Sequence, residues 1–502
     1  MVENGRYSTL VNSELSPREA MEADLLFVRE VLVEAGIGFR LVRGNDHRPV
    51  LAIDNADRER LRSALVAAAA TEPFMLATEG KKAGPPVPIA DGLLLLGPND
   101  RNFVVYRPRV APFGGLTYGA ESGVRLETWV FADEAVEAPL ESALTRQLIP
   151  RSELIETTVE RYGLSWPSYE PMFETLASDI TFDIDMVFSW VDGTDLEFQR
   201  ARARQMQSYV VGEGDDHEAR FRQLDELRYA LRSVHLFAPW VRRIFVVTDS
   251  PAPYWLAEHP GVTIVRSEEF FADPSVLPTH NSQAVESQLQ HIPGIAEHFL
   301  YSNDDMFFGR PVTPDMFFTP GGVTKFVEAT TRIGLGTSNT LRSGFENSAR
   351  VNRALLAERF GVTITRHLEH CAAPLRRDVL LELEREFAED FSRTAASRFR
   401  SSTDISVTNS LYHYYALLTG RAVVQERVKV RYVDTTMRAG LVAMDKLLAK
   451  RNVDMFCLND GSFPEISTEE RAEAVRTFLD NYFPVVAPWE RIEAITAETR
   501  VG

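Results

Sequence analysis

Three hydrophobic stretches of the sequence end in acidic residues, and this pattern constrains both the fold and the site. The stretches and their endings are Ile184–Val191 before Asp192-Gly193, Ile244–Val247 before Thr248-Asp249, and Phe299–Ser302 before Asn303-Asp304-Asp305. In an open parallel sheet, ligands bind outside the carboxyl ends of the strands. Carboxylates gathered there repel one another unless a cation lies among them, and Mg²⁺ or Mn²⁺ bound together with substrate phosphates is the simplest explanation. The sequence therefore predicts a metal-dependent enzyme acting on a nucleotide-linked substrate.

Strands and helices alternate in the sequence after Asp183. We expect strands at 184–191, 243–248, 262–266 and 298–302, and helices at about 223–237, 252–258 and 282–291. This alternation predicts an α/β fold with a doubly wound, mostly parallel sheet. Residues 331–348 are rich in Gly, Ser, Thr and Asn and are expected to form a mobile loop over the site. Further helices are expected at 351–360, 377–391, 409–418 and 468–482, so that helical elements complete a domain spanning 176–490.

The first 175 residues are expected to form a smaller α/β domain of their own. Hydrophobic periodicity predicts helices at 16–35 and 56–70, and strands at 39–42, 50–53, 92–96, 102–106 and 124–131. The prolines of Ser165–Pro171 place the boundary just after this stretch. The domain has no acidic cluster, no Gly-rich phosphate loop and no Cys/His set, so its sequence indicates no chemistry.

Composition excludes several classes of protein. The chain has 502 residues and a net charge of -18, which argues against sequence-independent nucleic-acid binding. Its two cysteines exclude a disulfide scaffold and fit a reducing compartment. The polar first residues predict no signal peptide, and no apolar run is long enough for a transmembrane helix. We therefore expect a cytoplasmic protein with no transmembrane segment.

Two motifs have both a functional and a structural explanation. Arg228 and Arg232 are four residues apart, so on a helix they point the same way and can clamp a phosphate. A solvated face that pairs with Glu226 or Asp225 explains them equally well. The segment 278–286 turns into a helix, and its hydroxyl and amide groups suit phosphate or sugar binding, although N-capping by Ser282 is the simpler interpretation.

Three further features are less specific. Trp190, beside the turn that ends its strand, suits either a core or a base-stacking position. The triplet Asn303–Asp305 follows an apolar run and requires solvent, a cavity or a metal. The pair His367 and His370 would need two more ligands to bind zinc.

Taken together and in this order, these segments resemble the Stealth family. This family contains the bacterial capsular polysaccharide hexose-1-phosphate transferases and the animal N-acetylglucosamine-1-phosphotransferase α/β subunit. The matching segments are Asp185–Asp195, Phe221–Leu256, Pro278–Gly309, His367–His370, Arg400–Asp404 and Phe456–Asp460. The resemblance covers roughly 183–488 and does not extend to 1–175. One position departs from it, because Gln223 stands where an acidic residue is expected.

The resemblance implies a reaction and a set of residues for it. A sugar-1-phosphate, first of all GlcNAc-1-phosphate, would pass from a UDP-sugar to a hydroxyl of an acceptor glycan, with release of UMP, in capsular or exopolysaccharide synthesis. The implied metal ligands are Asp192, Asp304 and Asp305, and the implied phosphate clamps are Arg228, Arg232 and Arg400. The implied base is His370, then His367, with Glu286 as a competitor. Donor contacts are expected from Trp190, Asp192, Gly193, Arg232, Asn281, Ser282 and Asn303.

Two alternatives remain open. A metal-dependent glycosyltransferase would use the same acids at the sheet end but would release UDP. A sugar-nucleotide or glycan-binding protein without catalysis is indicated only by Gln223. The transferred sugar, the acceptor, the choice between Mg²⁺ and Mn²⁺ and a possible homo-oligomer are not determined by the sequence.

Overall fold

The computed structural model describes residues 2–3, 6–79, 84–97, 99–193, 224–461 and 464–491. Gln223 lies outside these residues. The chain divides into two compact units, Met1–Ala177 and Ser178–Gly502. Within the described ranges, no helix is both long and apolar enough to cross a membrane.

The first unit is built on a mixed sheet of eight strands. Its path β13-β12-β11-β8-β6-β7 is extended by β5, which is parallel to β11, and by β4, which is antiparallel to β5. Helices α1 (Pro17–Glu34), α2 (Arg58–Ala68) and α3 (Ile89–Leu95) contribute to a core that also holds Leu51 and Leu126. The strands of the unit are β1 (Val2–Glu3), β2 (Arg6–Tyr7), β3 (Leu10–Val11), β4 (Phe39–Arg43), β5 (Pro49–Asp54), β6 (Met75–Thr78), β7 (Val87–Pro88), β8 (Asn102–Tyr106), β9 (Arg109–Val110), β10 (Thr117–Tyr118), β11 (Val124–Phe131), β12 (Ala135–Glu137), β13 (Leu148–Pro150), β14 (Ile155–Arg161) and β15 (Leu164–Glu170).

The expected strand at 92–96 is wrong, because this stretch belongs to helix α3. A short apolar run does not distinguish a strand from a buried helix. The buried side chains of Ile89 and Leu93 are four residues apart and share one helix face. Gly92 permits close packing there, because a Cβ atom would lie 2.9 Å from Val87 Cγ2 and 3.0 Å from Leu76 Cβ.

The second unit contains the predicted mostly parallel sheet, and its strand order is β18-β17-β16-β19-β24. Strands β16 (Ile184–Ser189), β17 (Ile244–Val247), β18 (Val262–Val265) and β19 (His298–Asn303) are parallel, and β24 (Ala373–Arg376) is antiparallel to β19. The chain builds outward from β16 to β18 and then returns to the other side of β16. The order of the strands therefore reverses between β16 and β19.

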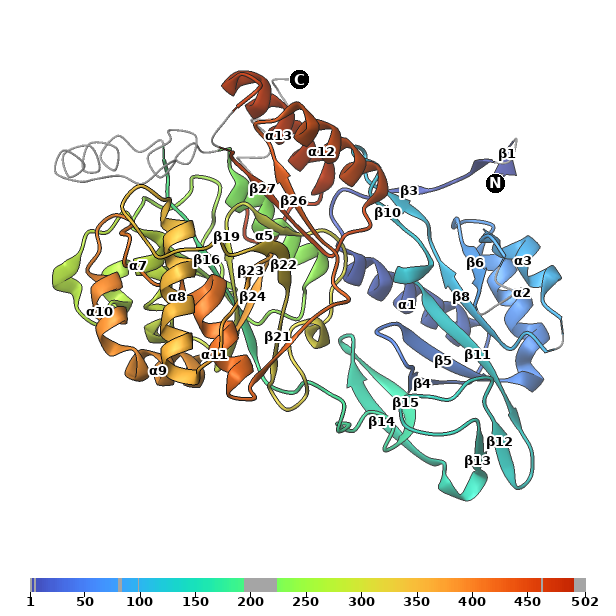
Figure 1. Cartoon of the computed structure of the whole chain (residues 1–502). Coiled ribbons are helices and arrows are strands. Elements are labelled where there is room, and N and C mark those ends of the chain that lie inside the picture. Colours follow the sequence, from blue (N-terminus) through green and yellow to red (C-terminus); the bar gives the residue numbers. More distant parts are fainter. Residues whose placement is uncertain are drawn as a thin grey trace. The chain divides into compact units, whose positions relative to one another are not determined.

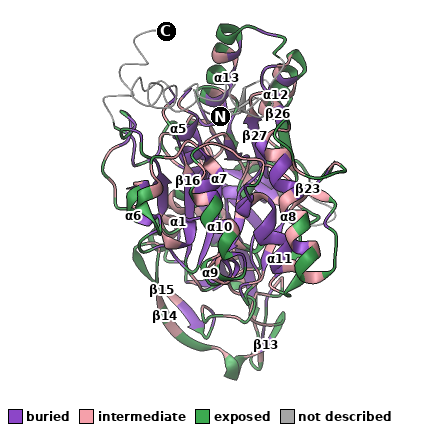
Figure 2. Ribbon diagram, turned by 60° about the vertical axis from the view of Figure 1, so that its left-hand side comes forward, coloured by how far each residue is buried: buried purple, intermediate pink, exposed green. Residues whose placement is uncertain are grey.

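One face of this sheet packs into a large apolar core. Val187, Phe245 and Phe299 lie in one cluster with side chains of helices on that face. The contributing helices are α6 (Ser267–Phe270), α7 (Ser282–Glu286), α8 (Gly344–Phe360), α9 (Arg377–Glu386), α10 (Ala388–Ala395) and α11 (Tyr412–Leu418). Figure 2 shows the strands as buried and the outer side of α10 as exposed. This arrangement fixes the ends of the strands rigidly.

A second layer joins the sheet through the chain that leaves β19. Strand β20 (Met306–Phe308) pairs with β27 (Met455–Asn459), which is parallel to β26 (Val430–Asp434). Figure 1 shows α12 (Arg438–Lys450) and α13 (Thr468–Tyr482) side by side next to these strands. The remaining elements are α5 (Glu226–Phe237), β21 (Thr324–Phe326), β22 (Glu328–Arg332), β23 (Arg366–Leu368) and β25 (Ala422–Val424).

The expected helix at 252–258 is also wrong, because these residues form turns. Pro251 and Pro253 lack backbone N–H donors and disfavour a helix around them. Trp255 and Leu256 are nevertheless buried, which explains the apolar pattern.

The expected mobile loop is shorter than 331–348, since α8 already begins at Gly344. Side chains of α8 hydrogen-bond the loop backbone. Asn347 Nδ2 donates to the Asn339 carbonyl at 2.9 Å, and Arg353 Nη2 donates to the Gly334 carbonyl at 3.0 Å. The loop is therefore tied to the helix in this structure, and its mobility stays a prediction.

Candidate active site

The carboxyl ends of β16 and β19 lie side by side where the sheet reverses its order. A crevice at such a reversal is where open α/β sheets bind their ligands. The register pairs Ser189 with Asn303, and the Ser189 hydroxyl lies 2.7 Å from the Tyr301 hydroxyl and donates to Asn303 Oδ1 at 3.3 Å. Asp192 and Gly193 follow β16, and the Asp192 N–H donates to Ser250 Oγ at 2.9 Å. The predicted acidic endings therefore belong to this crevice.

Acidic groups are crowded after β19. Burial, together with the charges of Asp305 and Glu226, raises the pKa of Asp304 well above its usual range. Burial also raises the pKa of Glu226 to about 7, and hydrogen bonds from the backbone and the charge of Arg471 offset only part of this effect. The Cys457 thiol donates to Asp305 Oδ2 at 3.5 Å. The site therefore holds more negative charge than its neighbours neutralise.

Carboxylate oxygens are the ligands that hard divalent cations prefer. In the ranges that the structure describes, no three His, Cys, Asp or Glu side chains are grouped so as to hold a metal ion. Mg²⁺ commonly takes only one or two protein carboxylates and completes its shell with water and substrate phosphates. The mutual repulsion of Asp304 and Asp305 would be relieved by such a cation, so the two residues suit a site that the substrate completes.

Glu286 is buried at the start of the same crevice. It ends helix α7, only 3% of its surface is exposed, and its Oε2 accepts a hydrogen bond of 2.6 Å from the Thr408 hydroxyl. Burial raises the pKa of this carboxyl, and the Thr408 hydrogen bond, the charge of Arg400 and hydrogen bonds with Tyr301 and Ser282 oppose the shift. Tyr301 therefore links Glu286 to Ser189 and Asn303.

Arg400 completes this group. Its Nη2 donates to Ser282 Oγ at 3.0 Å, next to the Glu286 carboxylate. Its aliphatic stem packs on Gly344, where a Cβ atom would lie 2.7 Å from Arg400 Cδ. The absence of a side chain at Gly344 thus allows the guanidinium stem to pass. The structure brings together four residues predicted from sequence: Ser282, Glu286, Asn303 and Arg400.

The two candidate histidines have different surroundings. His367 is buried and stacks on Phe345 at a centroid distance of 4.5 Å. His370 is half-buried, and its ring centroid lies 6.0 Å from that of Phe345 and 5.4 Å from that of Tyr432. Burial lowers the pKa of both imidazoles, so both are neutral near pH 7. Of the two, His370 has the better access to solvent.

Arg228 and Arg232 converge on a residue that the sequence did not single out. Arg228 Nε donates to Glu490 Oε2 at 2.6 Å, and Arg232 donates through Nε to Oε1 at 2.7 Å and through Nη2 to Oε2 at 2.8 Å. Arg232 also donates to the carbonyl of Phe483 at 2.9 Å. The carboxylate that pairs with both arginines is thus Glu490, and not Glu226 or Asp225, which the sequence suggested as partners. The pair therefore has a structural task, and contact with a donor phosphate stays a prediction.

Asn281 and Trp190 are both deeply buried. Asn281, and not Ser282, is the N-cap of α7: its Oδ1 accepts from the N–H of Gln283 at 3.1 Å. Its Nδ2 donates to Asp404 Oδ2 at 2.8 Å and so ties α7 to the segment before Arg400. Trp190 is 4% exposed, and its indole N–H has no hydrogen-bond partner among the described residues.

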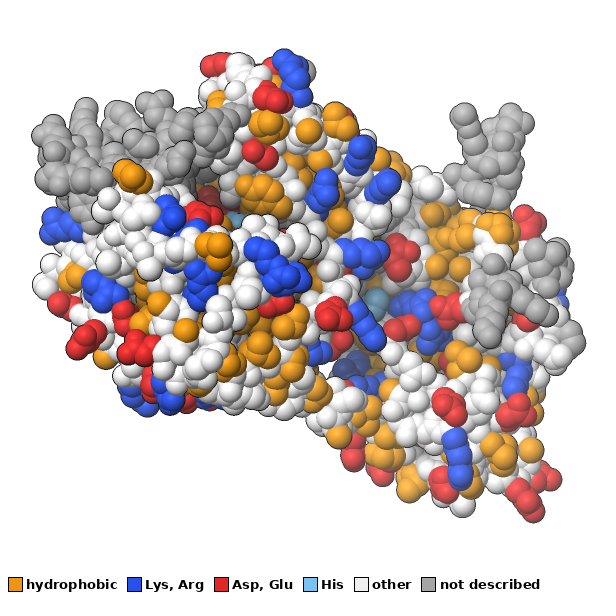
Figure 3. Space-filling model, in the orientation of Figure 1, with side chains coloured by type: hydrophobic (Ala, Val, Ile, Leu, Met, Phe, Trp, Pro, Cys, Tyr) orange, Lys and Arg blue, Asp and Glu red, His pale blue; other side chains and the backbone are white. Residues whose placement is uncertain are grey.

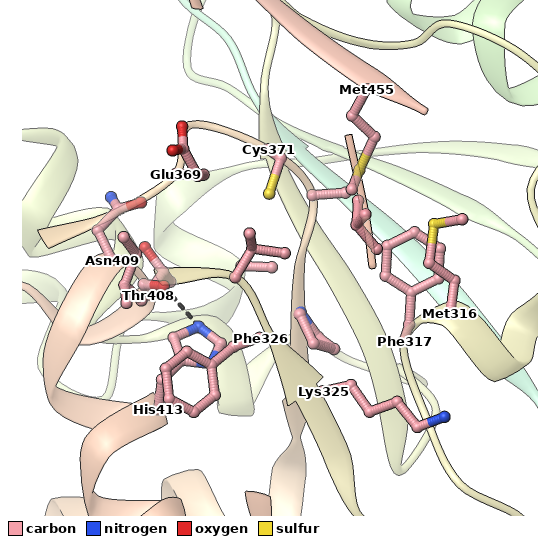
Figure 4. A pocket seen from close by; sticks show the side chains of 16 residues that line it. Met316, Phe317, Lys325, Phe326, Glu369, Cys371, Thr408, Asn409, His413 and Met455 are labelled. Atoms are coloured by element: carbon pink, nitrogen blue, oxygen red, sulfur yellow. Dashed lines mark hydrogen bonds between the residues drawn. The ribbon is translucent and has the colours of Figure 1, made fainter. Parts of the chain in front are cut away.

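A small pocket lies behind the crevice (Figure 4). Its volume is about 20 Å³, which is room for about one water molecule. Thr408, which donates to Glu286, forms part of its wall together with Glu369, Cys371 and His413, and a ring nitrogen of His413 lies 2.9 Å from the Thr408 carbonyl oxygen. The pocket is too small for a sugar ring.

Acidic and basic side chains are interspersed on the face shown in Figure 3. This face has no continuous basic stripe of the kind that follows a nucleic-acid backbone. The observation agrees with the net charge of -18.

The structure adds three residues to the predicted set. Tyr301 and Thr408 hold the Glu286 carboxylate, and Glu226 adds a third acid beside Asp304 and Asp305. Two of them left a signal in the sequence: Glu226 belongs to the motif that contains Arg228, and Tyr301 begins the motif that ends in Asp304-Asp305. Thr408 left none, because no spacing distinguishes such a hydroxyl residue in a helix from a core residue.

Four segments of the chain match the conserved regions of Stealth proteins. Conserved region 1 matches residues 182–209, region 2 matches 220–326, region 3 matches 369–417 and region 4 matches 445–500. The exopolysaccharide phosphotransferase CpsY of Mycobacterium tuberculosis is 60% identical over 96% of this chain and 91% of its own length. The chain belongs to the Stealth family.

Other relatives agree with this membership. CpsY of Mycobacterium leprae is 57% identical over 96% of this chain and 89% of its own length, and the exopolysaccharide phosphotransferase of Nocardia farcinica is 56% identical over 96% and 90%. Among solved structures, the galactosyltransferase LgtC aligns with 62% of this chain and 99% of its own, at 12% identity and a TM-score of 0.30, and we draw no inference from it.

The Stealth regions divide the candidate residues. Asp192, Glu286, Asp304, His370 and Arg400 all lie inside matched regions. His367 lies just before region 3. The matched regions thus contain these acids, Arg400 and one of the two histidines.

Proposed function

We propose that this protein is a hexose-1-phosphate transferase of exopolysaccharide synthesis. It would transfer the sugar-1-phosphate of a UDP-sugar, first of all UDP-GlcNAc, to a hydroxyl of an acceptor glycan. The observation that carries the proposal is the pair of buried acids near Tyr301 at the reversal of the sheet, Asp304 and Glu286, with Arg400 beside Glu286, since acids and a guanidinium in one place suit a metal-bound diphosphate. Family membership and the phosphotransferase names of the relatives support the same reaction.

Asp192, Asp304 and Asp305 are the residues proposed to hold Mg²⁺ or Mn²⁺. When bound, the cation would supply charge neutralisation for the diphosphate and for the UMP that leaves. The carboxylates would hold the cation at the ends of β16 and β19, and the cation would in turn bind the diphosphate. Asn303, Gly193 and Trp190 flank this position in the sequence and are proposed donor contacts.

Arg400 is the proposed phosphate clamp. Its guanidinium reaches Ser282 across the crevice, and a charge-assisted contact of this kind is about twice as strong as a neutral hydrogen bond. Asn281 would act through Asp404, by holding the segment that precedes α7 against the one that contains Arg400. Arg228 and Arg232 are proposed to support the site by holding helix α5 to Glu490, rather than by contacting the phosphate, because Glu490 accepts hydrogen bonds from both.

His370 is the proposed base, and Glu286 is its competitor. The acceptor oxygen forms a bond to the β-phosphorus of the donor, and the bond from that phosphorus to the oxygen shared with the α-phosphate breaks. UMP leaves with the electron pair of the broken bond, and the acceptor proton passes to the imidazole. His370 suits this step because its lowered pKa keeps it neutral at pH 7 and because it is accessible. Glu286 is enclosed by Thr408, Tyr301 and Ser282.

The released nucleotide tests the proposal. The full chain is incubated with Mg²⁺, a glycan acceptor and a panel of UDP-sugars, and the nucleotide product is identified by chromatography. We expect UMP with at least one donor. UDP as the product would show that the chain is a glycosyltransferase, and intact donor in every case would favour a binding protein.

A further inference from the structure

Two aromatic rings lie close to the imidazole of His370. Tyr432 lies in β26 with its ring centroid 5.4 Å from the imidazole, and Phe345 lies in α8 with its centroid 6.0 Å away. Tyr432 is 42% exposed although its neighbour Val433 is buried. A large ring held in solvent beside a candidate base is available for contact with a ligand.

The Tyr432 side chain lies on the acidic side of the second layer. The register pairs Tyr432 with Cys457 of β27, and side chains of paired residues project to the same face of a sheet. The Cys457 thiol donates to Asp305. Tyr432 therefore spans the distance between His370 and the proposed metal ligands, which is where an acceptor hydroxyl must enter.

Both aromatic residues lie outside the matched Stealth regions. Region 2 ends at 326, region 3 covers 369–417 and region 4 begins at 445, so Phe345 and Tyr432 fall in the two stretches between them. His370 and Asp305, which they adjoin, lie inside. A residue that lies beside the proposed catalytic residues but outside the matched regions suits a task that differs between relatives. Choice of acceptor is such a task.

We propose that Tyr432, with Phe345 nearby on the other element that contacts His370, forms the acceptor site and binds a neutral hexopyranose. The inference rests on the proposed function, whose acceptor it specifies. The ring offers an apolar face to the C–H face of a pyranose, while its hydroxyl and the sugar hydroxyls stay in water.

The charges around Tyr432 select for a neutral sugar. Burial raises the pKa of the Tyr432 hydroxyl, and the nearby Asp305, Asp434 and Asp460 raise it further, although Asp460 forms an ion pair with Arg471. Asp434 Oδ1 accepts from the Thr436 N–H at 3.0 Å, and Asp460 Oδ1 accepts from the Thr435 hydroxyl at 2.9 Å. These contacts keep the acids in place. A uronic acid would be repelled.

Binding of simple glycosides tests the inference without any donor. Saturation-transfer NMR on the full chain uses methyl glucoside, methyl galactoside and methyl mannoside as probes. Sorbitol, which has hydroxyls but no ring face, and methyl glucuronide, which is charged, serve as comparisons. We expect at least one neutral glycoside to bind and both comparison compounds to bind more weakly by about tenfold. Equal signals for sorbitol and the glycosides, or none for any glycoside, would overturn the inference.

Variants separate a platform from a structural tyrosine. Tyr432→Phe should keep glycoside binding, whereas Tyr432→Ala should weaken it by about tenfold or more. Tyr254→Ala, at another exposed tyrosine of the same unit, should leave the binding of the glycosides unchanged. Loss of binding in the Phe variant, or full binding in the Ala variant, would contradict the platform.

A donor assay distinguishes failure of this inference from failure of the proposed function. With water in place of a glycan, the parent should release UMP from the UDP-sugar, and in the complete reaction Tyr432→Ala should raise the KM for the acceptor far more than the KM for the donor. A Tyr432→Ala variant that loses UMP release to water would place Tyr432 at the donor and overturn the inference. If the parent releases no UMP from any donor, the proposed function fails, and glycoside binding still decides the inference.

Discussion

Two buried glutamates of the second unit, Glu490 and Glu286, have opposite environments. Both are nearly inaccessible, with 6% and 3% of their surface exposed. Burial alone would raise the pKa of Glu490, but the hydrogen bond from Arg232 and the charges of Arg232 and Arg228 hold it below its usual range. Burial raises the pKa of Glu286, and its partners do not reverse the shift.

This difference separates structure from chemistry. A buried carboxylate that is fully paired holds elements together, here helix α5 with the segment around 483–490. Buried acids without full neutralisation cost stability and are retained where a ligand or a reaction needs them. Asp304 belongs to the second class with Glu286, because Asp305 and Glu226 add like charge instead of neutralising it. Both classes look alike in the sequence.

The largest expected effect is that of Asp304→Asn. The change keeps the shape and removes one charge from the crowded acids, so transfer should fall by about 10³-fold or more. The melting temperature should stay the same or rise, because a repulsive charge is lost. Transfer rates and thermal unfolding are measured in parallel.

Chelation of divalent ions should abolish transfer in the parent, and Mg²⁺ or Mn²⁺ should restore it. Full turnover in excess EDTA would show that transfer does not depend on a divalent cation.

The second prediction concerns the base. His370→Ala should slow transfer by about 10²–10⁴-fold with little change in donor affinity. The acidic limb of the pH–rate profile should disappear, because protonation of His370 is what reduces the rate there. His367→Ala is the control and should keep that limb. If instead the His370 variant keeps its turnover at saturation, Glu286 becomes the base.

The third prediction applies to the paired glutamate. Glu490→Gln leaves two buried arginines without their carboxylate and should lower the free energy of unfolding by about 3–5 kcal/mol. Chemical denaturation measures the loss. Turnover per folded molecule at low temperature should stay near that of the parent. A stable Glu490 variant that has lost transfer would place Arg228 and Arg232 at the donor and break the comparison.

Arg400 should show the reverse behaviour. Arg400→Ala removes a charged phosphate contact of about 1.5–3 kcal/mol, which corresponds to a rate loss of about ten- to a hundredfold. Its melting temperature should change little, since Arg400 is half-exposed and an ion pair at such a position contributes only about 0–1 kcal/mol to stability. Arg400→Lys, which keeps the charge but not the forked geometry, should recover only part of the rate. A large loss of stability with normal turnover would make Arg400 a structural residue.

The smallest effect tests the sign of the Glu286 shift. The pKa of Glu286 in the folded protein lies above its value of 4.5 in the unfolded chain. The ionised carboxylate therefore lowers the free energy of unfolding at higher pH, and this loss disappears as the pH falls below about 4.5. Glu286→Gln should therefore raise the melting temperature by about 2–4 °C at pH 8 and by nothing near pH 4. Glu490→Gln should show the opposite pattern, with a loss at pH 8 that shrinks as the pH falls through the lowered pKa of Glu490. Equal pH slopes for both variants would refute the distinction.

Much of the fold follows from sequence patterns of short range. Strands β8 and β11 and helix α13 have the predicted bounds, because periodicity and capping groups such as Ser467 act locally. The helix at 89–95 and the turns at 252–258 were missed, since an apolar run has no period and since prolines can override an apolar pattern.

The site was predictable only in part. Acids at the strand ends follow from the order of the chain, so Asp192 and Asp304 could be placed. The Arg228–Glu490 pair joins residues 262 positions apart, and the Tyr301–Glu286 contact depends on the side chain of a strand meeting a helix end. No spacing encodes such contacts. Structure was needed to separate the arginine at the crevice from the two arginines bound to Glu490.

The central claim is that the crowded acids and Arg400 act on the β-phosphorus of a nucleotide sugar. The most direct test follows that atom, with UDP-GlcNAc, or whichever donor is accepted, labelled with ³²P at the β-position. The account predicts that the label moves to the glycan product with the parent protein and with Glu490→Gln, and that it stays in the donor with Asp304→Asn. Label recovered in UDP, beside a glycan that has gained unlabelled sugar, would contradict the account.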